Sequence, residues 1–112
     1  MATSTSRLSY DDAFTVMDEA IADPKGARVM FDNHGQATYF KMRLHSARQI
    51  DRNDNKQIFA EGEKLYGRSV YDTLVVRVRG PDEDGKWWVY LENVLLNIQG
   101  KLERLSDLEE AP

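Results

Sequence analysis

The chain has no cysteine, only two histidines and no long apolar run, and each of these absences excludes a class of protein. Without cysteine there is no disulfide, no thiolate metal site and no cysteine nucleophile, which suits a reducing cytosol. No apolar segment approaches the roughly 18 residues of a membrane-spanning helix, and the first residues lack the apolar core of a signal peptide. We therefore expect a cytoplasmic protein with no membrane partner.

Catalytic and cofactor signatures are also missing. The sequence has neither a glycine-rich phosphate loop nor a G-x-S-x-G nucleophile elbow. His34 and His45 do not form a metal-ligand spacing, and the carboxylates of residues 82–84 fall in a hairpin tip, where such groups are normally solvated. We predict that the protein is not an enzyme and uses no metal or cofactor.

Length and net charge limit the remaining classes. A chain of 112 residues is expected to form one domain, and its net charge of −4 argues against a protein that coats nucleic acid with its whole surface. The predicted domain spans residues 9–105, after a flexible lead-in over residues 1–8 and before an acidic tail over residues 106–112. A local basic surface can still steer an anionic ligand when the net charge is unfavourable.

Two helices are predicted in the first half of the chain. Apolar residues at helical spacing predict the first over residues 9–22, which Ser9 and Asp12 would open as a capping box. Asn33 or Asp32 is expected to cap the second helix, which is predicted in residues 35–52.

Three segments predict strands, namely residues 27–31, 73–80 and 86–92. The last two are joined by the turn sequence GPDEDG and are expected to form a hairpin. Alternation in residues 73–80 separates an apolar face from a face that carries Arg77 and Arg79. The predicted fold class is α+β, in the order α-β-α-loop-β-β-α, with a three-stranded, mainly antiparallel sheet covered by helices on one face.

The clearest helical pattern lies in residues 35–52. Its apolar stripe is expected to face the core, and a neighbouring stripe is basic and consists of Lys41, His45, Arg48 and Arg52. Arg43 lies away from this stripe, where a structural ion pair is the simpler interpretation. Lys and Arg contacts to phosphates supply most non-specific affinity for nucleic acid. This helix is therefore the predicted nucleic-acid-binding element.

Arg77 and Arg79 strengthen this interpretation. The returning strand brings one of its two faces beside these arginines, and we assign Trp88 to that face. Aromatic groups beside basic ones can stack on unpaired bases. The predicted nucleic-acid-binding residues are Lys41, His45, Arg48, Arg52, Arg77, Arg79 and Trp88.

The C-terminal part has apolar residues at alternating spacings of four and three, which predicts an amphipathic helix. Its apolar stripe consists of Leu95, Ile98, Leu102 and Leu105. We expect this helix to dock on the domain or on its own copy in a homodimer. With the acidic helix over residues 9–22, it supports an alternative function as a protein-interaction module, in which the basic stripe serves an acidic partner.

Alternating oxygen-bearing side chains at Asp51, Asn53 and Asn55 resemble the start of an EF-hand calcium loop. Lys56 stands where that loop requires glycine, and Glu61 falls one position short of the bidentate ligand. We therefore predict no metal site here.

The order of elements over about residues 9–92 resembles a winged-helix domain, with GPDEDG at the tip of the wing and the recognition helix in residues 57–66. The layout as a whole is similar in style to small accessory proteins of bacteriophages. That resemblance implies action on nucleic acid or on a host protein, including inhibition of host defence or transcription. Nucleic-acid binding through residues 35–52 is the leading hypothesis, and a protein-interaction module or phage-type inhibitor is the alternative.

Overall fold

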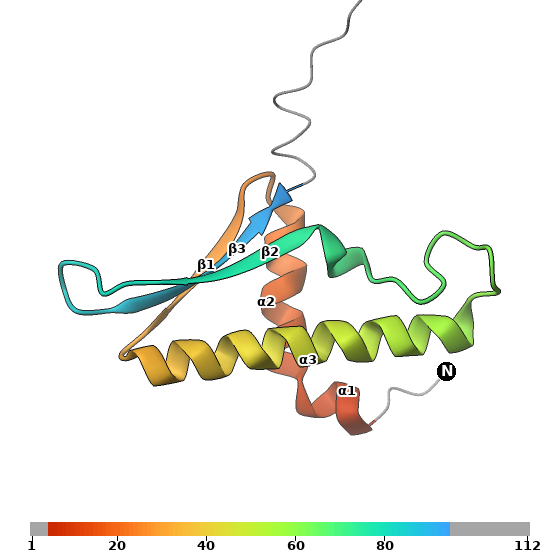
Figure 1. The fold of residues 1–112 in the computed structure, drawn as a ribbon, viewed down its shortest axis with the longest axis horizontal. Coiled ribbons are helices and arrows are strands. Elements are labelled where there is room, and N and C mark those ends of the chain that lie inside the picture. Colours follow the sequence, from red (N-terminus) through yellow and green to blue (C-terminus); the bar gives the residue numbers. More distant parts are fainter. Residues whose placement is uncertain (1–4, 95–112) are drawn as a thin grey trace, which may run out of the picture.

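The computed structural model describes residues 5–94 and contains a three-stranded antiparallel sheet with helices on one side (Figure 1). The strands are β1 (Gly26–Phe31), β2 (Leu74–Arg79) and β3 (Trp87–Asn93). The helices are α1 (Thr5–Ser9), α2 (Asp11–Ala22) and α3 (His34–Ile58), with a short 3-10 helix, η1 (Val70–Thr73), before β2. The predicted α+β class and its antiparallel sheet are confirmed.

The central strand of the sheet is β3, although it comes last in the chain. Both β1 and β2 pair with it in antiparallel fashion, so that Val29 and Val78 lie on either side of Val89. Successive side chains of a strand point to opposite faces, and these three valines share the face that the helices cover. That inner face is apolar.

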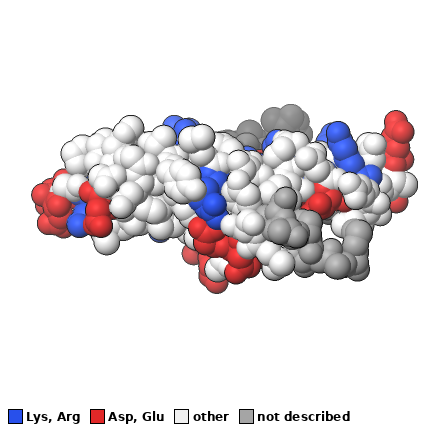
Figure 2. All heavy atoms as spheres, turned by 90° about the horizontal axis from the view of Figure 1, so that it is seen from below, with Lys and Arg blue, Asp and Glu red and all other residues white. Residues whose placement is uncertain are grey.

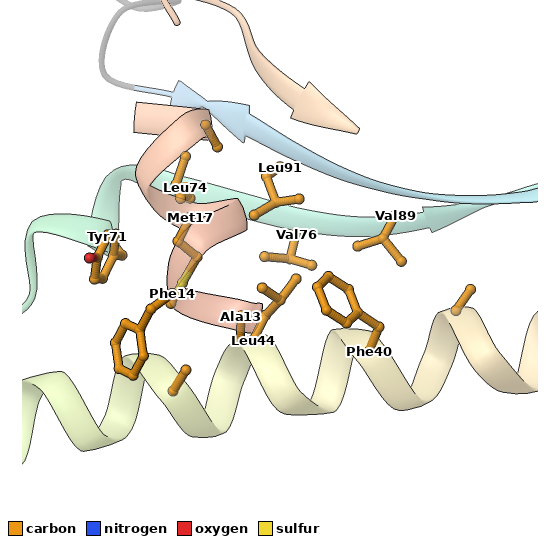
Figure 3. Packing of buried hydrophobic residues seen from close by; sticks show 13 residues of the cluster. Ala13, Phe14, Met17, Phe40, Leu44, Tyr71, Leu74, Val76, Val89 and Leu91 are labelled. Atoms are coloured by element: carbon orange, nitrogen blue, oxygen red, sulfur yellow. The ribbon is translucent and has the colours of Figure 1, made fainter. Parts of the chain in front are cut away.

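A single apolar core fills the space between the inner face of the sheet and the helices α2 and α3 (Figure 3). Met17 of α2, Leu44 of α3 and Leu91 of β3 are fully buried in it. The core consists of Ala13, Phe14, Met17, Ala20, Ala37, Phe40, Leu44, Ala47, Tyr71, Leu74, Val76, Val89 and Leu91. Its sheet residues all come from one face, so the outer face contributes nothing to it.

The helix α3 runs further than the sequence pattern indicated, to Ile58, because polar residues on its last turns have partners in the fold. Asp51 is buried and accepts hydrogen bonds from Ser69 Oγ at 2.6 Å and from Arg7 Nη1 at 3.0 Å. Arg7 was expected in a flexible lead-in, but its guanidinium also lies 4.1 Å from the centre of the Phe14 ring. Residues 51–58 of the segment that resembled a calcium loop are therefore helical, and within residues 5–94 no side-chain cluster is arranged to hold a metal ion.

The helix starts were predicted with mixed success. Asn33 caps α3 as expected, since its side chain accepts a hydrogen bond from the Gln36 amide at 2.9 Å. The capping box of α2 was wrong, because Ser9 ends α1 and the residue before α2 makes no side-chain cap bond. Asp12 instead pairs with Arg43 at 2.6 Å, which is the structural ion pair expected for this arginine.

Residues 59–69 consist of turns and irregular backbone. Asn55 of α3 anchors the segment by donating a hydrogen bond to the Arg68 carbonyl at 2.6 Å. The predicted recognition helix of a winged-helix domain, in residues 57–66, is thus reduced to the end of α3.

The predicted partner-binding stripe of Leu95, Ile98, Leu102 and Leu105 lies outside the described residues, and the dimer contact through it stays a prediction. Of the helices in residues 5–94, none has both the length and the apolar character needed to cross a bilayer.

Candidate nucleic-acid interface

The basic stripe of α3 does not form a continuous exposed surface. Arg48, predicted to contact phosphate, is buried, and its Nη2 donates a hydrogen bond to the Leu74 carbonyl at 3.0 Å. Leu74 begins β2, so this bond joins α3 to the sheet. The guanidinium serves the fold and is out of reach of a ligand.

Arg52 is also used within the fold. Its Nε and Nη2 donate to Asp72 Oδ1 at 2.9 and 2.7 Å. Burial alone would raise the pKa of Asp72, but the hydrogen bonds from Arg52 and from the Ser69 backbone amide bring that pKa below its usual value. Two of the four stripe residues therefore stabilise the junction of α3 with η1 and β2.

Figure 2 views the molecule from the side on which α3 lies in Figure 1. The surface is mostly neutral there, with basic and acidic groups in small separate patches. Two large apolar side chains of α3, Tyr39 and Met42, are each 63% exposed. The exposed face of this helix is a poor match for a polyanion.

His45, the histidine of the basic stripe, has a pKa that reflects the positive charges around it. Burial, and then the nearby charges of Arg48, Lys41 and Arg52, lower the pKa of His45 below its ordinary value of 6.5. We expect a proton NMR titration of His45 to have its midpoint below 6.5, and Lys41→Met to move that midpoint upward. Because folding lowers this pKa, protonation of the imidazole favours the unfolded chain. Stability should therefore fall as the pH drops from 6.5 through the folded-state pKa.

The outer face of the sheet carries the other predicted residues. Strand pairing aligns side chains across all three strands in two neighbouring rows, which are Arg28–Tyr90–Arg77 and Met30–Trp88–Arg79. The three arginines are exposed, and none of the six residues belongs to the core. We call the set Arg28, Arg77, Arg79, Trp88 and Tyr90 the arginine–aromatic face.

Arg28 of β1 lies against both aromatic rings of this face. Its guanidinium carbon is 3.8 Å from the centre of the Trp88 ring, and its Nη1 donates a hydrogen bond to Tyr90 Oη at 3.1 Å. A guanidinium over an aromatic ring gains from the ring quadrupole, typically by ~0.5–1 kcal/mol at exposed sites. These contacts place the three side chains against one another on the surface of the sheet.

Three further contacts involve Trp88 and Arg79 of this face. Trp88 Nε1 donates to Asp82 Oδ2 at 2.7 Å, and this bond is the largest cause that lowers the pKa of Asp82. The guanidinium carbon of Arg79 lies 5.5 Å from the centre of the Tyr90 ring, and its Nη2 lies 3.6 Å from Glu92 Oε1. Asp82 thus anchors the edge of the Trp88 indole. The Arg79 side chain remains 57% exposed although it is paired with Glu92.

The structure brings Arg77, Arg79 and Trp88 together, as predicted, and adds Arg28, which was missed. A signal for Arg28 was present, because it alternates with Val29, whose side chain faces the core. The pattern could not show that β1 pairs with β3, which places Arg28 beside a tyrosine 62 positions away.

The fold and this face define a small α+β protein with an open sheet surface of arginine and aromatic residues. Comparison of the chain with protein-family models, curated proteins and solved structures gave no match. The face is therefore interpreted from its own geometry.

Proposed function

We propose that this protein binds nucleic acid through the arginine–aromatic face. The observation that carries the proposal is the juxtaposition of Arg28, Arg77 and Arg79 on an exposed sheet face beside two aromatic rings. Guanidinium groups match phosphate geometry with paired donors, and aromatic groups add a surface for bases. No helix within residues 5–94 covers this face.

The sheet supports the proposal better than α3 does. In α3, Arg48 is buried with its Nη2 on the Leu74 carbonyl, and Arg52 is paired with Asp72, so neither guanidinium is presented freely to a ligand. On the sheet, Arg79 Nη2 lies 3.6 Å from Glu92 Oε1, and the three guanidinium groups outnumber the two carboxylates that contact this face, Glu92 and Asp82. The net charge of this face is positive although that of the chain is −4.

Salt dependence tests the proposal. If Arg28, Arg77 and Arg79 each contact one phosphate, log K should fall with log salt at a slope of about −2 to −3, so raising salt from 50 to 200 mM should weaken binding by roughly 20–40-fold. Fluorescence anisotropy of labelled oligonucleotides measures this directly. An absence of binding at the lower salt concentration would contradict the proposal, as would an affinity that does not change with salt.

A protein partner is the second candidate, favoured by the neutral surface of α3. Tyr39 and Met42 are exposed there, and Tyr39 lines an open groove of about 560 Å³ together with Phe31 and Phe40. Exposed apolar groups of this kind are typical of protein-interaction sites. Binding that tolerates salt and is lost in Tyr39→Ala, with the sheet arginines intact, would support this candidate over nucleic acid.

A further inference from the structure

We infer, on the basis of the proposed function, that the arginine–aromatic face takes unpaired bases, so that its ligand is single-stranded nucleic acid. In a duplex the faces of the bases are stacked inside, and only backbone and groove edges are available to a protein. A surface that presents aromatic and guanidinium planes to solvent therefore gains most from a strand whose bases are free.

Guanidinium and aromatic groups lie against one another on this face. The Arg28 guanidinium carbon lies over the Trp88 ring, 3.8 Å from its centre, and a base can extend or replace this contact. The centre of the Tyr90 ring lies near two guanidinium carbons, 5.8 Å from that of Arg28 and 5.5 Å from that of Arg79. Bases stack on both aromatic rings and arginine planes in single-strand recognition.

The ring positions also suit neighbouring nucleotides. Trp88 and Tyr90 are two residues apart on β3, which separates their Cα atoms by about 6.6 Å along the strand. Two consecutive bases can therefore each meet one ring. Arg77 and Arg79, on the neighbouring strand β2, then lie beside this path, where they can contact the phosphates.

The shape of the face argues against a duplex. The major groove of B-DNA admits a helix or a two-stranded ribbon, whereas here the arginines lie on the two outer strands, β1 and β2, with β3 between them and neighbouring strands about 4.8 Å apart. The turn that joins β2 to β3 carries Asp82, Glu83 and Asp84, so the hairpin tip would repel phosphate rather than enter a groove. A flexible single strand can instead follow the face with its phosphates beside Arg77 and Arg79 rather than at the tip.

Anisotropy titration with a labelled oligothymidylate and with a blunt duplex of the same length distinguishes the two ligands. We expect the single strand to bind at least about 10-fold more tightly. Trp88→Leu should weaken single-strand binding by roughly 5–150-fold, the measured range for loss of one stacked base. It should leave the salt slope unchanged, because no phosphate contact is removed. Trp88→Phe should restore much of the affinity.

Intrinsic fluorescence supplies a second readout that does not depend on removing Trp88. In a Trp87→Phe variant, Trp88 is the only tryptophan of the chain, and a stacked base should quench its emission. Equal affinity for single strand and duplex, with no quenching and no effect of Trp88→Leu, would overturn the single-strand inference but leave salt-dependent binding in place. Failure to bind either oligonucleotide at low salt would overturn the proposed function as well.

Discussion

Arg77→Glu combined with Arg79→Glu is expected to weaken nucleic-acid binding by roughly 10²- to 10⁴-fold at low salt. A hydrogen bond to a charged group contributes ~1.5–3 kcal/mol, so losing two such contacts costs ~3–6 kcal/mol, and each 1.4 kcal/mol is about a tenfold change. The slope of log K against log salt should become shallower by about 1.4–1.8, because two phosphate contacts disappear. Anisotropy titration at several salt concentrations measures both effects.

The matched control is Lys64→Glu combined with Arg68→Glu. Both residues are exposed in the segment that follows α3, at the opposite end of the molecule from the hairpin tip in Figure 1. The control changes the net charge by the same amount, so it reproduces any effect of overall repulsion. An equal loss of affinity in the two double variants would show that binding depends on net charge rather than on the arginine–aromatic face.

The double variant Arg77→Glu and Arg79→Glu should change the free energy of unfolding only slightly. Arg77 and Arg79 are exposed, and exposed ion pairs such as that of Arg79 with Glu92 contribute ~0–1 kcal/mol. A lost affinity accompanied by an unchanged melting temperature would therefore reflect the surface and not the fold.

Leu44→Ala is expected to reduce the free energy of unfolding by ~2–5 kcal/mol, as measured by urea denaturation. The Leu44 side chain is fully buried where α3 crosses beneath the sheet, and its removal leaves a cavity that the neighbouring strands cannot fill. Small domains are stable by only ~5–15 kcal/mol, so the variant should populate unfolded chain at moderate temperature.

Met42→Ala is the control for this change. It removes a side chain of similar size from the same helix, two positions earlier, but that side chain is 63% exposed. Substitutions at such positions usually stay within ~0.5 kcal/mol. If both variants lost the same stability, the assignment of the inner face of α3 would be wrong.

Much of the fold could be predicted because hydrophobic periodicity is a local property. The helix over α2, the three strands and the hairpin turn follow from spacing and turn residues. The apolar stripe predicted in residues 35–52 does face the core, where its Phe40 and Leu44 are buried. The length of α3 could not be predicted, because residues 51–58 look like a polar loop. They are helical because Asp51 meets Arg7 and Ser69, which lie far away in the sequence.

The candidate site shows the same division between local and distant information. Helical spacing correctly placed Lys41, His45, Arg48 and Arg52 near one another, since the pKa of His45 is lowered first by burial and then by the charges of the other three residues. Spacing could not distinguish a charge that faces water from one that faces the fold. Only the position of the Leu74 carbonyl decides that Arg48 is buried.

The sequence by itself determined the α+β class, the apolar inner faces and the alternation that keeps arginine and aromatic side chains on one face of each strand. These follow from the 2.0 and 3.6 periods of strand and helix, which depend on nearest neighbours. The tertiary structure alone decided that β3 lies between β1 and β2. That pairing gathers Arg28, Trp88, Tyr90, Arg77 and Arg79 on one surface, because hydrogen bonds between strands join residues that no local pattern connects.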